Sequence, residues 1–493
     1  MDFDFNTIKK YFKYKSKLGQ YFQVISDETA EDLNLDLVFL KLDKNISKIG
    51  QQFFYSKLRI IEQEKDKSLE KYIEFFNTQD SKKVEKDLEK LNKEKDYEII
   101  DLIENDIFIN QKILNYAKLS IGFLIVILIC GCFVKQCLAL LFPLFLLNAY
   151  HHYSNKSYVE FYNSIISRLH TMLVVAKNIG KTETFANDYK SIKLKKLENS
   201  FWSSHLTEQL AKNEFLIVFW AILELCRIMF NLEIFGFARK AKILNTSKNE
   251  LLQVFEFVGK IDTANTIAKI RKDFTTTEPK FSSIKKLEVK NIYHPLIDNC
   301  VKNDLTLENS SIVLTGSNMS GKTSFMRVVA VNALFAQSFG FCFADYYSAP
   351  FMKILTSISV QDDINDSKSY YLEEVLRIKE FLEESTDYKL ILIDEIFKGT
   401  NTKERIAISK SVLNTLNSSK NIVFITTHDL EIATFLEQHN YQLYYFSESL
   451  DSETIKFTYK INSGINTKTN AIRILEMYDY PQAIVSEAYK LLD

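Results

Sequence analysis

The chain has little proline, and most of it lies toward the C-terminus. Five prolines occur in 493 residues, and Pro143 is the only one before Pro279. Because proline breaks a helix interior, its scarcity leaves residues 1–278 able to run as helices with little interruption. The sequence therefore predicts a mostly α-helical N-terminal part that ends near FTTTEP at Phe274–Pro279.

The sequence also lacks an excess of charge of one sign. A formal net charge of −1 gives the whole molecule no attraction for nucleic acid, so any DNA contact has to come from local lysine and arginine patches. Six cysteines have neither paired nor metal-ligand spacing, which argues against a metal cluster and predicts a reducing cytosol. The first thirty residues mix polar and aromatic side chains, so we expect no secretory signal.

The most informative segment that is present is SIVLTGSNMSGKTS, at Ser311–Ser324. It reads as an apolar strand, a glycine loop of the form G-x-x-x-x-G-K-[ST], and a helix start. Backbone N–H groups of such a loop cradle phosphates at a helix N-terminus, so the pattern predicts a nucleoside triphosphate site. We expect ATP to contact the loop and the first helical turn: Gly316, Ser317, Asn318, Met319, Ser320, Gly321, Lys322, Thr323 and Ser324.

The polar groups that such a loop requires follow downstream. LILIDE at Leu390–Glu395 reads as a buried parallel strand that ends in two carboxylates. Asp394, with the hydroxyl of Thr323, is predicted to hold Mg²⁺, and Glu395 to polarise the attacking water. His428 follows the next apolar strand and can reach the γ-phosphate, while Lys322 neutralises it. Together these catalytic candidates, Glu395, His428 and Lys322, predict phosphoryl transfer to water.

These motifs resemble the ATPase domain of the MutS family of DNA mismatch-repair proteins. TGSNMSGKTSFMR is similar to the family's TGPNMSGKST-type loop, and YHPLI at Tyr293–Ile297 resembles its lead-in. DEIFKGTNT at Asp394–Thr402 and TTHDLE at Thr426–Glu431 resemble two further family motifs. The resemblance covers Lys285 to the C-terminus and implies an ABC-type ATPase with a mostly parallel sheet, ATP and Mg²⁺.

SVQDDINDSKSYYLEE at Ser359–Glu374 resembles the family's signature segment, in which a serine of one subunit completes the nucleotide site of another. Ser369 falls on the position of that serine, so the resemblance implies a homodimer in which Ser369 contacts the partner's ATP. The family usually has glycine where Ser367 stands, which implies a tighter backbone approach and slow or asymmetric turnover.

A weaker resemblance lies near the N-terminus, where Asp32–Arg59 is similar to the segment that opens the family's helical core domain. An ordinary amphipathic helix pair is the alternative. The charged stretch Ile61–Asn105 predicts a further, long pair of amphipathic helices. The family's mismatch-reading module, which wedges a phenylalanine beside a glutamate, has no counterpart here, so we expect a short variant without it.

An apolar block occupies Leu119–Tyr150 and is broken only by Lys135-Gln136. Its two runs, of 16 and 11 residues, are each shorter than the roughly 20 that span a bilayer comfortably. A membrane-inserted hairpin with Lys118 and Lys156 at its cytosolic flanks is favoured over a buried helix pair of a soluble core. A third apolar run, Phe215–Phe230, contains Glu224 and Arg227 and predicts a core helix.

The sequence therefore predicts an α-helical part followed by an α/β part. The expected divisions are a helical core-like segment and charged arm at 1–116, the hydrophobic hairpin at 117–152, a helical continuation at 153–278 and the MutS-like ATPase domain at 279–493.

We expect a dimeric ATPase that binds duplex, mismatched or branched DNA and is attached to the cytosolic face of the membrane through residues 119–150. Two alternatives remain open, a membrane-associated ATPase scaffold that does not bind DNA and the ATPase half of a transporter. Transporters of this type carry an LSGGQ-like signature and several spanning helices in each chain, and the sequence contains neither.

Overall fold

The computed structural model describes residues 5–63, 66–78, 80–192, 217–317, 320–358, 370–450, 455–465, 471–478 and 480–492. These residues form two compact units. The first unit comprises the described residues of Met1–Gly19, Lys44–Ser56 and Asp66–Ala268, and the second those of Gln20–Asp43, Lys57–Lys65 and Lys269–Asp493. Two short N-terminal segments thus belong to the C-terminal unit, which the sequence did not indicate.

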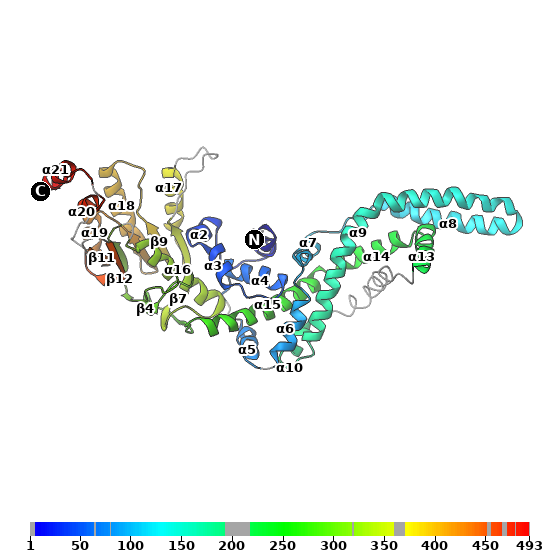
Figure 1. Ribbon diagram of the computed structural model, residues 1–493, viewed down its shortest axis with the longest axis horizontal. Helices are drawn as coiled ribbons and strands as arrows, with labels where there is room; N and C mark the ends of the chain where they lie inside the picture. The colour runs from blue at the N-terminus through cyan, green and yellow to red at the C-terminus, as the bar shows by residue number, and fades with distance from the viewer. Residues whose placement is uncertain are drawn as a thin grey trace. The chain divides into compact units, whose positions relative to one another are not determined.

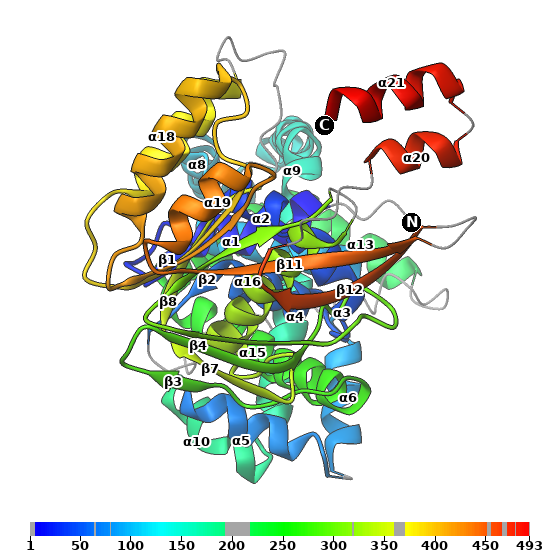
Figure 2. The same ribbon diagram turned by 90° about the vertical axis from the view of Figure 1, so that its left-hand side faces the viewer.

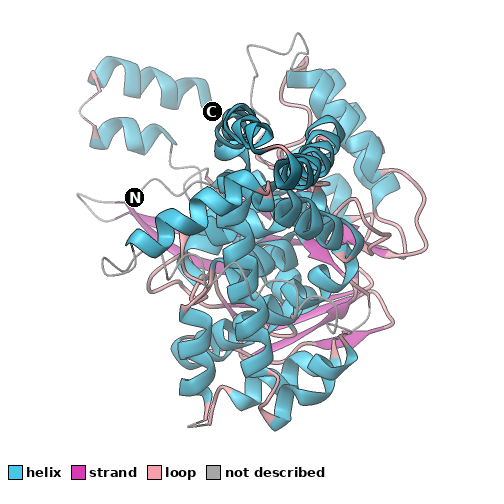
Figure 3. Ribbon diagram, turned by 90° about the vertical axis from the view of Figure 1, so that its right-hand side faces the viewer, coloured by secondary structure: helices cyan, strands magenta, loops and turns pink. Residues whose placement is uncertain are grey.

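The first unit is built from helices, which dominate the view in Figure 3. In chain order they are α1 (Phe5–Lys15), part of α4 (Lys48–Arg59), α5 (Lys67–Phe75), α6 (Ser81–Glu89), the 3₁₀ helix η1 (Glu94–Glu98), α7 (Ile99–Glu104), α8 (Gln111–Phe133), the 3₁₀ helix η2 (Lys135–Leu140), α9 (Leu141–Ile179), α10 (Glu183–Ser191), α13 (Ile217–Met229), α14 (Leu232–Thr246) and most of α15 (Lys248–Asp273).

The expected mostly helical N-terminal part is therefore confirmed, but the charged stretch Ile61–Asn105 is not a long helix pair. It contains the short helices α5, α6, η1 and α7. Asp66 accepts a hydrogen bond from the backbone N–H of Ser68 at 3.0 Å and so caps α5 locally, which starts a new helix inside the stretch. The amphipathic spacing correctly predicted that this stretch is helical, but the helices are shorter than predicted.

Helices α8 and α9 form a hairpin, and they lie side by side in Figure 1. Polar groups meet between them, because Asn148 of α9 accepts hydrogen bonds from Tyr116 at 2.8 Å and from Ser120 at 2.7 Å. The Asn148 amide in turn donates to the carbonyl of Met229 at the end of α13, at 3.0 Å. Leu124, Ile127 and Leu144 form a small buried cluster, but many other apolar side chains point outward: the exposed fractions are 54% for Phe123, 56% for Ile129 and 69% for Phe142.

Among the described helices, α8 is long and apolar enough to cross a membrane, with a mean hydropathy of 2.2 over its most apolar window. Only 22% of that window is buried within the protein. The third apolar run carries its charges as ion pairs: in α13, Glu224 lies 3.2 Å from Arg227 and 3.3 Å from His152 of α9. These contacts fit the expectation of a helix that packs within the helical unit.

The second unit is an α/β domain. Its elements are β1 (Gln23–Val24), α2 (Asp27–Asp32), α3 (Leu35–Leu42), β2 (Ile60–Ile61), β3 (Lys280–Ser282), β4 (Lys286–Ile292), β5 (Asn303–Glu308), β6 (Ser311–Thr315), α16 (Lys322–Phe339), β7 (Tyr346–Pro350), β8 (Met352–Ser357), α17 (Tyr370–Phe381), β9 (Tyr388–Asp394), α18 (Thr402–Leu416), β10 (Asn421–Thr426), α19 (Leu430–Glu437), β11 (Tyr441–Leu450), β12 (Ile455–Ser463), α20 (Ala471–Met477) and α21 (Gln482–Leu492).

The main sheet of this unit has the strand order β12-β11-β6-β10-β9-β8. The five strands from β11 to β8 pair in parallel, and β12 pairs antiparallel with β11 at one edge. A smaller sheet has the order β3-β7-β4-β5. The expected α/β part with a mostly parallel sheet is confirmed, and in such a sheet ligands bind at the carboxyl ends of the strands.

Helices cover both faces of the main sheet, which explains why its central strands are apolar throughout. Helix α16 contacts β8, β9 and β10. The odd-numbered residues Val313, Ile391 and Val423 point to the other face, where they share a core with residues of α17, α18 and α19. Figure 2 shows α18 and α19 next to each other over the strands.

Candidate active site

The predicted phosphate loop leaves β6 at Thr315 and enters α16 at Lys322. Two glycines give it its shape, because Gly316 has φ +125° and Gly321 has φ +106°. At Gly316 a Cβ atom would lie 2.9 Å from the carbonyl oxygen of Phe446, so a side chain is excluded by both backbone and space. The loop is also tied internally, since the Ser320 hydroxyl donates to the carbonyl of Ser317 at 2.7 Å.

Lys322 is buried at the start of α16, with 2% of its surface exposed. Its ammonium group donates to the carbonyls of Gly316 at 2.6 Å and Ser317 at 2.8 Å, so it folds back over the loop. Burial lowers the pKa of Lys322 to about 8, although Asp394 and Glu395 oppose the shift. A buried cation at a helix N-terminus is suited to an anion such as a phosphate group.

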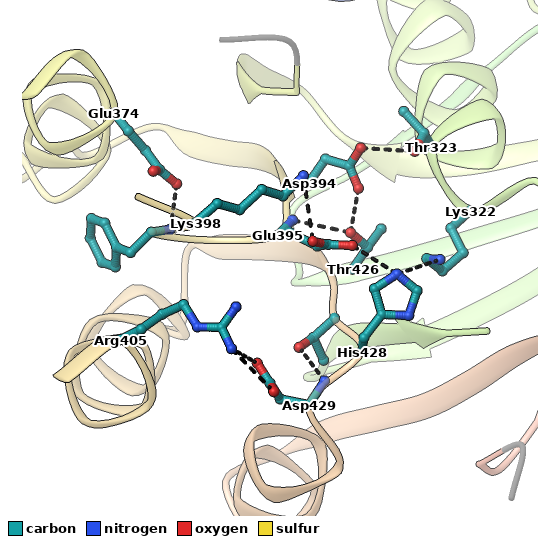
Figure 4. Close-up of polar contacts among 12 residues, drawn as sticks. Lys322, Thr323, Glu374, Asp394, Glu395, Lys398, Arg405, Thr426, His428 and Asp429 are labelled. Carbon is teal, nitrogen blue, oxygen red and sulfur yellow. Dashed lines mark hydrogen bonds and ion pairs between the residues drawn. The ribbon is translucent and has the colours of Figure 1, made fainter. Parts of the chain in front are cut away.

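The register of strands β9 and β10 places Thr426 beside Asp394. Thr426 of β10 is the direct neighbour of Asp394 of β9, and the Thr426 hydroxyl donates to the Asp394 carboxylate. The other carboxylate oxygen of Asp394 accepts a hydrogen bond from the Thr323 hydroxyl at 2.8 Å. Thr323 and Asp394, predicted from separate motifs, therefore meet at the carboxyl edge of the sheet (Figure 4). Two oxygen donors of this kind suit a hard cation such as Mg²⁺.

Glu395 and His428 also meet, as Figure 4 shows. The His428 Nε2 lies 2.8 Å from one Glu395 oxygen, and the Lys398 ammonium lies 3.5 Å from the other. The hydrogen bond from His428 lowers the pKa of Glu395 to about 2, against the opposing effect of burial and with a further lowering by Lys398. His428 also lies 3.5 Å from Lys322, so it connects the loop lysine with Glu395.

Three predicted site residues, Asn318, Met319 and Ser369, lie outside the described residues. The other loop positions, Ser317, Ser320 and Gly321, lie where the pattern placed them, and Ser324 is exposed on the first turn of α16.

Sequence reasoning missed several groups at this site. Glu448 of β11 accepts a hydrogen bond from the Ser317 hydroxyl at 2.8 Å, and no motif marked it. Thr426 was part of a motif, but only the register of β9 and β10 reveals its contact with Asp394. Glu374 falls on a matching position of the signature segment, but only the structure shows that it accepts a hydrogen bond from the backbone N–H of Phe397, two residues after Glu395.

The fold and the site define a class: an α/β domain with a phosphate-loop-type turn at the carboxyl edge of a mostly parallel sheet, beside a cation, two hydroxyls, two carboxylates and an imidazole. These are groups that phosphoryl transfer uses. Comparison with known families is more specific, since residues 312–493 match the model of MutS domain V. The C-terminal region of the chain is therefore similar to the MutS family.

Similar curated proteins agree with this assignment. The chain is 31% identical over 255 residues to "DNA mismatch repair protein MutS" of Thermotoga maritima, an alignment that covers 50% of this chain and 32% of that protein. It is 32% identical over 239 residues to the protein of the same name from Carboxydothermus hydrogenoformans, covering 46% and 28%. It is also 32% identical over 235 residues to "MutS protein homolog 4" of Mus musculus, covering 44% and 24%. The chain thus spans about a quarter to a third of the length of these relatives.

Proposed function

We propose that this protein is an ABC-type ATPase in which ATP binding joins two copies of the chain and hydrolysis releases them. The observation that carries the proposal is the meeting of Thr323 with Asp394, at 2.8 Å, beside the buried Lys322. These residues come from two elements of the α/β unit, α16 and β9, and their convergence on one helix N-terminus is what a triphosphate site requires.

In binding, the Lys322 ammonium exchanges its hydrogen bonds to the loop carbonyls for the β- and γ-phosphate oxygens. Backbone N–H groups at the start of α16 donate hydrogen bonds to the other phosphate oxygens. Mg²⁺ would be held by the Thr323 hydroxyl and the Asp394 carboxylate and would neutralise charge on the transferring phosphoryl group. Thr426 keeps Asp394 in place, because its hydroxyl donates to the same carboxylate.

In hydrolysis, the Glu395 carboxylate accepts a hydrogen bond from the attacking water and orients it toward the γ-phosphorus. The new O–P bond forms as the bond to the β-phosphate oxygen breaks, which yields ADP and phosphate. Because its pKa is about 2, Glu395 is ionised at neutral pH and can take this role. His428 holds Glu395 at 2.8 Å and can itself donate to the γ-phosphate.

Completion of the site by a second copy rests on the MutS resemblance, in which Ser369 of one subunit contacts the ATP of the other. Closure and release of two such domains would move the attached helices. By the same resemblance, we propose that this motion acts on a bound DNA duplex, with mismatched or branched DNA as candidate substrates. The names of the similar proteins support this assignment.

DNA binding predicts a strong dependence on salt. We expect the chain to bind a fluorescent duplex, and log K to fall linearly with log salt concentration, by about 0.9 for each phosphate contact, because phosphate contacts release counterions. Anisotropy titrations with perfect, mismatched and branched duplexes at several salt concentrations measure this. If no duplex binds at low salt, or if the slope is zero, the chain functions without DNA, and the membrane-associated scaffold becomes the better interpretation.

We further propose that the hairpin of α8 and the start of α9 inserts into a lipid bilayer and attaches the protein to the cytosolic face of the membrane. Its polar side chains Ser120 and Asn148 are buried between helices, while many apolar ones, such as Phe123, Ile129 and Phe142, face outward, which is unusual for a water-soluble hairpin. With 23 residues, α8 is about 34 Å long, similar to a bilayer core. Tyr150 and Tyr153 are exposed at its base, where a bilayer has its interface.

Lysine substitutions on the exposed face of α8 test whether the hairpin attaches the protein to a membrane. Ile125→Lys with Ile129→Lys places two charges on side chains that are 52% and 56% exposed, one helical turn apart. We expect this variant, like deletion of Leu119–Leu147, to move from the membrane fraction to the soluble fraction, since each central lysine costs about 3 kcal/mol in a bilayer.

The matched control is Ile284→Lys with Leu430→Lys, two similarly exposed positions of the α/β unit, at 58% and 53%. This control should stay in the membrane fraction. Should wild-type protein fail to float with vesicles, or should the Ile125/Ile129 variant float equally well, the hairpin is not a membrane anchor.

A further inference from the structure

The turn that carries Glu395 has an unfavourable backbone. Glu395 has φ +55° and Phe397 has φ +58°, in the left-handed region that non-glycine residues rarely adopt. Each such residue costs on the order of 1 kcal/mol or more and persists only where neighbouring groups hold it. Groups that hold this turn therefore decide where the Glu395 carboxylate lies.

The backbone N–H groups of the turn show which groups hold it. The N–H of Glu395 donates to the Thr426 hydroxyl at 3.1 Å, and the N–H of Phe397 donates to the carboxylate of Glu374. The Phe397 side chain is held by the same helix, because its ring lies 6.1 Å from the ring of Tyr371. Helix α17 thus contacts both the backbone and the side chain of Phe397, as Figure 4 shows for Glu374.

Glu374 is a buried acidic residue. It is 2% exposed, and its second carboxylate oxygen has no hydrogen-bond partner among the described residues. Burial raises the pKa of Glu374 above its ordinary value, although the hydrogen bond from Phe397 and the nearby Lys398 oppose the shift. A buried carboxylate with one unpaired oxygen destabilises a fold, so its retention here calls for an explanation, and its hydrogen bond goes to the turn of Glu395.

The helix that supplies Glu374 is itself anchored at its next turn. Arg377 of α17 lies 3.2 Å from the carboxylate of Asp32, which is 1% exposed at the end of α2. The same Asp32 oxygen accepts hydrogen bonds from the hydroxyl of Thr356 at 2.7 Å and the N–H of Ile358 at 3.1 Å. Asp32 therefore ties α17 to the end of β8, and Glu374 extends from a fixed helix.

We propose that Glu374 is a positioning residue for ATP hydrolysis: by fixing the backbone at Phe397 it sets the place of the Glu395 carboxylate, and it couples α17 to the catalytic turn. The inference rests on the proposed ATPase function. Helix α17 begins at Tyr370, directly after Ser369, so a movement of this helix when a partner's ATP is engaged would be transmitted through Glu374 to Glu395 within the same chain.

The test compares three substitutions at one position. Glu374→Gln keeps an oxygen that accepts the Phe397 N–H, whereas Glu374→Met removes the acceptor at similar volume and Glu374→Ala removes volume as well. We expect kcat to fall about 10- to 100-fold in the Met and Ala variants, because a small displacement of a reacting group has an effect of that size. ATP affinity and KM should stay within about threefold, since Lys322 and Thr323 are untouched. The Gln variant should retain kcat within about threefold.

The matched control is Glu380→Gln, an exposed position on the same helix, which should behave as wild type. ATP binding by the variants, measured at equilibrium, separates a positioning role from misfolding, because an unfolded variant loses binding together with turnover. If the Met variant binds ATP and retains full kcat, or if the Gln variant loses as much kcat as the Met variant, the inference is wrong. If wild-type protein itself neither binds nor hydrolyses ATP, the proposed function fails instead.

Discussion

Replacement of Lys322 by alanine is expected to abolish ATP binding, lowering the affinity at least about 100-fold, which corresponds to about 2.7 kcal/mol. The lysine is the buried cation of the loop, and charge-assisted contacts to phosphate in a site shielded from water are among the strongest polar interactions. Titration with a fluorescent ATP analogue measures the loss. Lys403→Ala, an exposed lysine at the start of α18, is the matched control and should bind normally.

The same residue predicts a pH dependence with a definite sign. Because the pKa of Lys322 in the ligand-free protein is about 8, the ammonium form decreases as pH rises through that value. Since the protonated form binds phosphate, ATP affinity should fall above pH 8 and be constant well below it, and bound phosphate should raise the pKa of Lys322. Lys322→Ala should lose this dependence. If a folded Lys322→Ala variant binds ATP with unchanged affinity, ATP does not bind at this loop.

Replacement of Glu395 by glutamine is expected to trap an ATP-bound dimer. Glutamine is similar in size and can still hydrogen-bond His428, so binding is retained, but it cannot accept the hydrogen bond of the water as a carboxylate does. Turnover should fall by about 100-fold or more. The dimer should accumulate because release needs hydrolysis, and size-exclusion chromatography with light scattering in Mg²⁺ and ATP measures its mass.

Two comparisons make this result specific. Glu384→Gln, an exposed carboxylate after α17, should hydrolyse ATP and dissociate like wild type. Adding Ser369→Ala to Glu395→Gln should reduce the dimer, if Ser369 completes the partner's site. If the Glu395→Gln protein hydrolyses ATP at the normal rate, Glu395 does not orient the attacking water. If it stays monomeric at saturating ATP, the two copies do not share a nucleotide site. Because the pKa of Glu395 is about 2, turnover above pH 4 should show no loss that arises from its protonation.

The sequence predicted those features of the α/β unit that depend on residues close together in the chain. The strand, loop and helix around Gly316–Thr323 follow one another in the chain, and their geometry depends on glycine conformation and on apolar spacing alone. The carboxylates after Leu390–Ile393 were placed correctly for a similar reason, since a buried parallel strand ends where its apolar run ends. Local rules also predicted helices over most of the N-terminal part.

Other features depended on residues far apart in the chain. Glu448 lies 131 residues from Ser317, and Glu374 reaches Phe397 because α17 packs against β8 and shares a hydrophobic core with residues of β9. The left-handed backbone of Glu395 had no sequence signal, because glutamate does not favour it and neighbouring contacts impose it. The segments Gln20–Asp43 and Lys57–Lys65 belong with the α/β unit for the same kind of reason.

By itself, the sequence determined the kinds of element, the phosphate loop and the chemical groups available to it, because backbone preference and apolar periodicity act over a few residues. The meeting of Thr323 with Asp394 was expected from the motifs, but tertiary structure alone decided that His428 contacts Glu395 and that α17 contacts the catalytic turn. It also decided that the hairpin buries Asn148 and exposes many of its apolar side chains. Strand register and helix packing set these distances, and both depend on the whole chain.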